Sequence, residues 1–156
     1  IRTNFILIAL ALIIMGIIIY LVDKYFATKK SISDLTLKDA FIIGCSQVFA
    51  LIPGFSRSGT TIAAGRCLNL KREDAAKFSF YLSAPVVLGA TILSLKDSID
   101  IIMANLPMFA TGILVSFVTG MLCIRFLMKY LKKHDFKIFM WYRLALGILV
   151  ILWTLI

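Results

Sequence analysis

Long apolar runs constrain the fold of this chain more than any other feature of its sequence. Residues 5–22 contain no charged side chain, and three further runs, at 75–95, 107–128 and 138–156, are nearly as apolar. Each is close to the roughly 20 residues that a helix needs to cross the hydrocarbon core of a bilayer. Hydrophobic residues make up 61% of the chain, against about 45–50% in soluble domains. The sequence therefore predicts an all-α integral membrane protein with about four transmembrane helices.

Two shorter apolar segments lie between the first and second of these runs. Residues 38–51 and 58–69 are separated by a Pro-Gly pair, and neither segment is long enough to cross a bilayer. Such irregular backbone survives at membrane depth only where protein or a wet cavity satisfies its polar groups. We therefore expect a re-entrant helical hairpin over about residues 38–69, within a single membrane domain at 1–156.

Basic side chains concentrate in short stretches between the apolar runs. The formal net charge is +9, and most of the Lys and Arg residues lie at 24–38, 66–77 and 129–137. If the hairpin returns to the side from which it enters, these stretches share one face, and the predicted loop at 96–106 lies on the other. The positive-inside rule then places the basic stretches in the cytoplasm. This distribution argues against nucleic acid as a partner, and the spacing of the three cysteines indicates no metal site.

The hairpin tip, "LIPGFSRSGTTIAAG" at residues 51–65, carries the chemistry. Ser56 or Ser58 can cap the second short helix, whose first amides and dipole then face the gap with roughly half a positive charge. Arg57 adds a full charge and a planar fork of donors suited to phosphate. Gly54 and Gly59 would let a ligand approach the backbone, and further hydroxyls come from Thr60 and Thr61. These features predict an oxyanion or phosphate cradle. The alternative is that Arg57 snorkels or pairs with a carboxylate while the hydroxyls bond backward along the helix.

The tip also carries the residues of a known family signature. The chain resembles the undecaprenyl-pyrophosphate phosphatases of the bacitracin-resistance type, whose PGxSRSxxT pattern is matched by Pro53, Gly54, Ser56, Arg57, Ser58 and Thr61. The segments "FSFYLSAP" and "YRLALG" are also similar to that family. The pattern differs from a nucleotide P-loop because the lysine of GxxxxGK[ST] is absent.

The resemblance implies a multi-pass enzyme of the bacterial inner membrane. Its reaction is the hydrolysis of undecaprenyl pyrophosphate to undecaprenyl phosphate and phosphate in the lipid carrier cycle of cell-wall synthesis, at a pocket facing the outer side. The family is built from two inverted halves, each with a re-entrant hairpin, and it uses a divalent cation, Mg²⁺ or Ca²⁺. This chain resembles the C-terminal half, and nothing in it matches the acidic motif of the other half. A missing N-terminal half is therefore an expected partner beside the polyprenyl lipid and the membrane, and a homodimer stays open.

The resemblance and the chemistry of the tip together assign roles to residues. We expect a catalytic group of Arg57, Ser56 and Thr61, and a substrate-binding group of Gly54, Ser58, Gly59, Thr60 and Gln47, with no metal ligand in this chain. Gln47 is included by repeat symmetry, as the counterpart of a glutamate in the other half. The nucleophile is Ser56, or else water or a group of the other half. A transporter or flippase for phosphorylated lipids or small anions is the alternative function, because the same hairpin could bind a head group without cleaving it.

Overall fold

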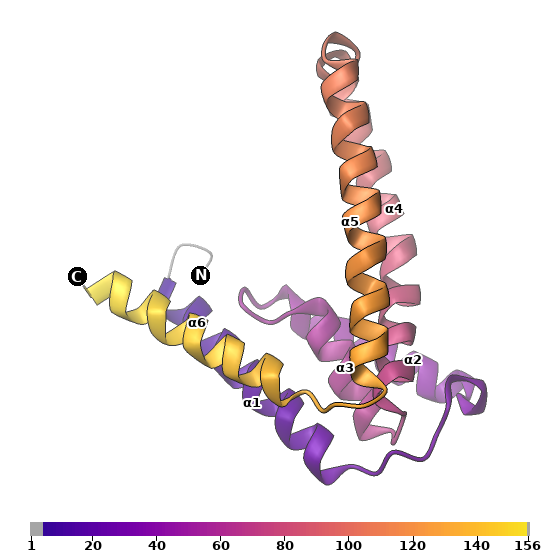
Figure 1. Cartoon of the computed structure of the whole chain (residues 1–156), viewed down its shortest axis with the longest axis vertical. Helices are drawn as coiled ribbons and strands as arrows, with labels where there is room; N and C mark the ends of the chain where they lie inside the picture. The colour runs from indigo at the N-terminus through magenta and orange to yellow at the C-terminus, as the bar shows by residue number, and fades with distance from the viewer. Residues whose placement is uncertain (1–4, 156) are drawn as a thin grey trace.

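The computed structural model describes residues 5–155, which are helical over most of their length (Figure 1). The elements are α1 (Phe5–Tyr25), the 3-10 helix η1 (Ile32–Asp34), α2 (Leu37–Cys45), the 3-10 helix η2 (Ser46–Leu51), α3 (Arg57–Cys67), α4 (Arg72–Ala104), α5 (Leu106–Leu131) and α6 (Lys137–Leu155). Over these residues there is no strand beyond one isolated bridge, between Lys30 and Leu70. Four helices are long and apolar enough to span a membrane: α1, α4, α5 and α6. The prediction of an all-α integral membrane protein is confirmed.

The long helices form two pairs, with α3 between them (Figure 1). α1 packs against α6, and the rings of Phe5 and Trp153 lie 6.2 Å apart, so the two helices run antiparallel. α4 and α5 form the second pair, which stands away from the first. α3 contacts both α1 and α4. α3 therefore connects the two pairs of long helices by packing against one helix of each pair.

The two short helices form a hairpin that returns to its entry side. α2 has 9 residues and α3 has 11, which at about 1.5 Å per residue is well short of the hydrocarbon thickness. The amides of Lys29 and Lys30 donate to the carbonyl of Asn69 at 3.0 and 2.9 Å, and the Lys71 amide donates to the carbonyl of Lys30 at 2.9 Å. Asn69, with φ 65°, ends α3 in the left-handed conformation common after helices. The two short helices thus form a hairpin whose two ends lie together, and its re-entrance into a membrane stays a prediction.

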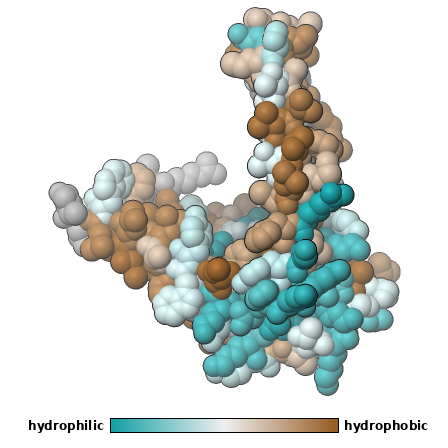
Figure 2. Space-filling view, in the orientation of Figure 1, coloured by the Kyte–Doolittle hydropathy of each residue, from teal (hydrophilic) through white to brown (hydrophobic). Residues whose placement is uncertain are grey.

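The basic stretches meet at a buried carboxylate, Asp23, near the end of α1. Arg66 of α3 donates its Nε to Oδ1 at 2.9 Å, and Arg72 of α4 donates its Nε at 2.8 Å. The backbone amide of Phe136, between α5 and α6, donates to Oδ2 at 3.3 Å. We call Asp23, Arg66 and Arg72 the Asp23 cluster. Figure 2 shows hydrophilic residues gathered at this end of the molecule and hydrophobic ones along the α4–α5 pair.

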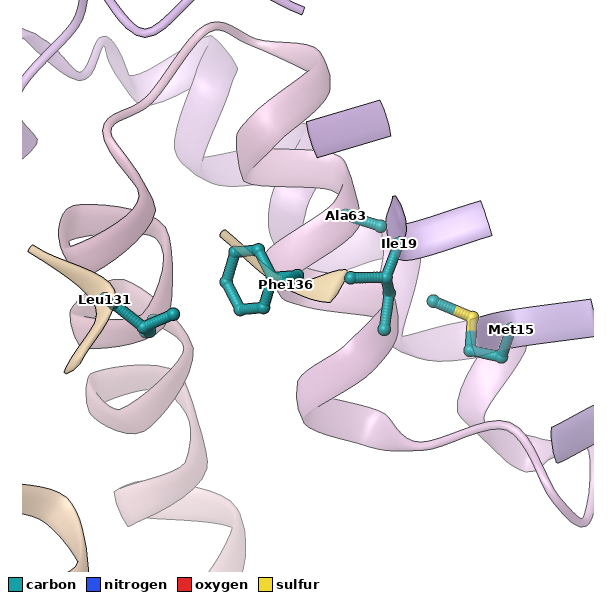
Figure 3. Close-up of a cluster of buried hydrophobic side chains, with 6 residues drawn as sticks. Met15, Ile19, Ala63, Leu131 and Phe136 are labelled. Atoms are coloured by element: carbon teal, nitrogen blue, oxygen red, sulfur yellow. The ribbon is translucent and has the colours of Figure 1, made fainter. Parts of the chain in front are cut away.

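The main hydrophobic core lies beside the Asp23 cluster. Met15 and Ile19 of α1 pack there with Ala63 of α3, and Leu131 and Phe136 close the core from the α5–α6 connection (Figure 3). Each of these side chains is buried. Between membrane helices, close van der Waals packing of such side chains is a main stabilising contribution. It fixes α3 against α1 and therefore fixes the position of the hairpin tip.

The region at 96–106 differs from its prediction as a loop. α4 is one continuous helix of 33 residues with Pro85 inside it. It ends at Ala104, and a single residue, Asn105, separates it from α5. At about 1.5 Å per residue α4 is close to 50 Å long, more than the hydrocarbon core requires. The polar residues after Lys96 thus extend the helix beyond its apolar window, which ends at Lys96. The polar residues there limit the apolar window but do not end the helix.

Candidate anion-binding site

The N-terminus of α3 is built as the sequence predicted, with Ser56 as its cap. Ser56 has extended backbone angles and its Oγ accepts a hydrogen bond from the Gly59 amide at 3.2 Å, while its carbonyl accepts from the Thr60 amide at 2.9 Å. The amides of Arg57 and Ser58 have no acceptor among residues 5–155. Two backbone donors and the positive end of the helix dipole are therefore available to a ligand.

The Arg57 side chain lines a cavity of about 330 Å³ beside this helix end. Arg57 is half-buried, and within the described part of the chain its side chain forms no ion pair with a carboxylate. This is the arrangement expected of a phosphate ligand and differs from the alternative of a structural ion pair. The residues that line the cavity are Ser56, Arg57, Ser58, Ser79, Phe80 and Ser83. The cavity thus combines one guanidinium with four serines, two on each side.

Ser79 and Ser83 are cavity residues that the sequence analysis did not identify. Both belong to α4, where a spacing of four residues places them on the same face of the helix. The Ser79 hydroxyl lies 2.7 Å from that of Thr61 across the α3–α4 contact. Both serines lie in "FSFYLSAP", a segment that the family resemblance includes. That they form a polar face of α4 lining a cavity could be recognised only once α3 was placed beside α4.

The two threonines of the tip do not present their hydroxyls to the cavity. Thr60 Oγ1 donates to the Arg57 carbonyl at 2.9 Å, and Thr61 Oγ1 lies 3.1 Å from the same carbonyl and 3.2 Å from that of Ser58. Thr60 is 5% exposed and Thr61 is 2% exposed. The backward bonding that was weighed as the alternative therefore describes Thr60. Thr61 has both carbonyls and the Ser79 hydroxyl within hydrogen-bond distance, and the serines and Arg57 line the cavity.

Gly54 and Gly59 both pack closely against α1, and their predicted role in substrate binding stays a prediction. Gly54 has φ 96°, and a Cβ added there would lie 2.5 Å from the carbonyl oxygen of Ile8. A Cβ on Gly59 would meet the side chain of Ile19 at 3.2 Å. Gly54 lies in the turn before α3. Gly59 follows Arg57 by two positions, about 200° around α3, so that Gly59 lies against α1 and Arg57 lies toward α4.

Gln47 lies in η2, the other arm of the hairpin, and is not among the residues that line the cavity. Its role by repeat symmetry stays a prediction. A second cavity, of about 500 Å³, opens on another face of α3 between α1 and η2. Its lining is almost wholly apolar: Met15, Ile18, Val22, Ser46, Phe49, Ile52, Phe55, Thr60, Ala63, Ala64 and Cys67. It offers no charged group to an anion.

The residues of the cavity do not fit a divalent cation. Mg²⁺ and Ca²⁺ prefer carboxylate and carbonyl oxygens, and no acidic side chain lines the cavity. Within residues 5–155, no three His, Cys, Asp or Glu side chains come together as a metal site would require. The electrostatics here are those of an anion site, with a guanidinium, a helix N-terminus and hydroxyl donors converging on one space.

Comparison with known proteins identifies relatives over nearly the whole chain. The family model described as Bacitracin resistance protein BacA matches residues 1–149. A protein of Gemmatimonas aurantiaca named undecaprenyl-diphosphatase is 43% identical over 145 residues, which cover 93% of this chain and 54% of the relative. Proteins with the same name from Caldicellulosiruptor bescii and Enterococcus faecalis are 44% and 42% identical, over 99% and 97% of this chain and 58% and 56% of the relatives. The chain spans a little more than half the length of the curated relatives it matches.

Proposed function

This chain belongs to the bacitracin resistance protein BacA family, and from that membership we propose that it works in hydrolysis of undecaprenyl diphosphate. The reaction adds water across one phosphoric anhydride bond and yields undecaprenyl phosphate and inorganic phosphate. The chain supplies the arginine and serine side of the site. The observation that carries the proposal is Arg57, which lines a cavity beside free helix amides and has no carboxylate partner among residues 5–155.

The geometry assigns complementary tasks to the cavity residues. Arg57 and the amides of Arg57 and Ser58 bind oxygens of the diphosphate and stabilise the negative charge that develops as the anhydride bond breaks. Ser56 is committed to capping α3 through its Oγ, which accepts from Gly59. Its hydroxyl proton can go to Ser58 Oγ, 3.1 Å away, or to an oxygen of the ligand. No described side chain is placed to act as its general base, so we assign the attack to water or to a group outside this chain.

The remaining parts of the site come from beyond the region described here. The relatives are longer than this chain, and we infer that a segment equivalent to their unmatched part supplies carboxylates. Those carboxylates, and not the residues of this cavity, would hold a divalent cation. Phosphate release that persists in excess chelator would exclude the cation.

The chain is a multi-pass membrane protein, and its charge distribution supports one orientation. The basic stretches meet at one end of the molecule, as they would on the cytoplasmic side of a bacterial inner membrane. The hairpin enters from that end, so that its tip, with Arg57, lies farther into the membrane. We place the opening of the cavity on the outer side.

The test is phosphate release by the full-length protein carrying Arg57→Ala. Loss of one preorganised donor to a developing oxyanion costs roughly 100- to 1000-fold in rate. Arg57→Lys should recover only part of this loss, because lysine keeps the charge but not the planar fork of donors. Arg125→Ala, at an exposed arginine of α5, is the matched control and should be close to wild type.

Two results would contradict the proposal. Unchanged turnover in Arg57→Ala would remove Arg57 from the mechanism. Movement of polyprenyl diphosphate across liposome membranes without release of phosphate would indicate the alternative, a flippase that uses the same cavity to hold a head group.

A further inference from the structure

We propose that Ser79 of α4 donates a hydrogen bond directly to a phosphoryl oxygen in the cavity, and that Thr61 acts through Ser79 as a positioning residue. The proposal rests on the function proposed above and adds a second wall to its binding site. Thr61 is 2% exposed and does not line the cavity. Ser79 is 5% exposed but does line the cavity, and its hydroxyl lies 2.7 Å from that of Thr61.

The proposal depends on how many hydroxyl protons Thr61 and Ser79 have to donate. A threonine hydroxyl has one proton and two lone pairs. Thr61 Oγ1 has three neighbours within hydrogen-bond distance: the carbonyls of Arg57 and Ser58 at 3.1 and 3.2 Å, and Ser79 Oγ at 2.7 Å. The carbonyls can only accept. Only two proton arrangements are therefore open to the pair of hydroxyls.

In the first arrangement Thr61 donates to a carbonyl, and Ser79 must then donate its own proton to Thr61. Only lone pairs of Ser79 would face the cavity, and they would repel an oxyanion. In the second arrangement Thr61 donates to Ser79, and the Ser79 proton is free to point into the cavity. The shorter distance, 2.7 Å, is the one between the hydroxyls. A bound phosphoryl oxygen selects the second arrangement, in which each hydrogen bond polarises the next.

Ser83, the other serine of α4 in the cavity, does not offer the same donor. Its Oγ donates to the Phe80 carbonyl at 2.8 Å, so its proton is already used within the helix. Among the described residues, Ser79 is thus the α4 hydroxyl that can donate toward the guanidinium side of the cavity. A diphosphate presents several anionic oxygens, and Ser79 can bind one that Arg57 and the α3 amides do not reach.

A double-mutant cycle in the full-length protein tests the proposal. The variants are Ser79→Ala, Thr61→Val and their combination, and the readouts are kcat/KM and the inhibition constant of inorganic pyrophosphate. Loss of a hydrogen bond to a charged group predicts a fall of about 10- to 100-fold in kcat/KM for Ser79→Ala, with weaker inhibition by pyrophosphate. Thr61→Val should act in the same direction, and the combination should be no worse than Ser79→Ala within about twofold, because the two residues act as one unit.

Controls separate binding from stability. Thr61→Ser keeps the hydroxyl and should restore both readouts, and Ser94→Ala on the same helix, away from this cavity, should leave them unchanged. Each variant's thermal unfolding midpoint in detergent shows whether it folds. If Ser79→Ala does not fold, the comparison of Thr61→Val with Thr61→Ser decides, since the proposal requires weaker pyrophosphate inhibition only in the former.

Several outcomes would overturn the proposal. Multiplying effects in the cycle would mean that the residues act independently, and a lower unfolding midpoint with unchanged pyrophosphate inhibition would make the pair a structural link between α3 and α4. If Ser79→Ala is silent while Arg57→Ala abolishes turnover, this inference fails and the proposed function stands. If both are silent, the proposed function itself fails.

Discussion

Replacing Asp23 by asparagine should destabilise the protein strongly, although Asp23 lies outside the cavity. The side chains of Asp23 and Arg66 are 2% and 1% exposed. Asp23→Asn keeps the shape but removes the charge that balances a buried guanidinium. Breaking a buried ion pair from one side typically costs about 3–5 kcal/mol. Arg66 also donates to the carbonyls of Asp23, Phe26 and Leu70, and these acceptors remain, so we expect the lower end, about 3 kcal/mol.

The same cluster provides a matched comparison. Arg72 contacts the same carboxylate but its side chain is 31% exposed. Arg72→Ala leaves Asp23 paired with Arg66 and with the Phe136 amide, so its loss should resemble that of a surface ion pair, at most about 1 kcal/mol. The double variant Asp23→Asn/Arg66→Met removes both buried charges and should be more stable than Asp23→Asn alone.

The measurement is the free energy of reversible unfolding in mixed micelles with increasing dodecyl sulfate, made on the full-length protein. The ranking is the result that matters: Asp23→Asn well below Arg72→Ala, with partial recovery in the double variant. If Asp23→Asn and Arg72→Ala differ by less than about 1 kcal/mol, the buried pair is not the source of stability that we infer. If the double variant is no better than Asp23→Asn, an uncompensated guanidinium is not the reason for the loss.

Two further predictions concern the hairpin turn and the orientation. Gly54→Ala should destabilise the protein by more than about 2 kcal/mol, since it combines a positive φ with a Cβ 2.5 Å from a backbone oxygen. The control Gly44→Ala, where an added Cβ would meet nothing within 4 Å, should be neutral or slightly stabilising. Equal free energies of unfolding for the two variants would refute this prediction. In a protein whose cysteines at 45, 67 and 123 are replaced by serine, an impermeant maleimide should label Asn105→Cys in intact cells and Lys133→Cys only after lysis. The reverse pattern would invert the proposed orientation.

The sequence was sufficient for features that depend on local chemistry and on length. The four spans followed from apolar length, and the hairpin followed from two short segments on either side of a Pro-Gly pair. The Ser56 cap was one of two predicted, and the structure selects it over Ser58. These features could be predicted because each depends on neighbours within a few residues or on the thickness of a bilayer.

Features that depend on tertiary packing could not be read from the sequence. Gly59 and Thr60 were expected to bind a ligand, but they do not line the cavity, because the face of α3 on which they lie is set by how α3 packs against α1 and α4. Ser79 enters the cavity from α4, and no pattern within its own segment shows what lies opposite. Asp23 was not identified from the sequence, because its partners are 43 and 49 residues away along the chain.

The Asp23 cluster has a consequence for the cavity at the far end of α3. Arg57 and Arg66 belong to the same helix and are nine positions apart, which at about 100° per residue directs them to opposite sides of it. Because the Asp23 cluster fixes Arg66, it also fixes the direction in which Arg57 points from the helix axis, although the two residues are roughly 13.5 Å apart along α3. A single residue inserted between them would turn the guanidinium away from α4 by about a quarter of a revolution or slightly more. The length of this segment is thus as tightly constrained by geometry as the identity of the arginine is by charge.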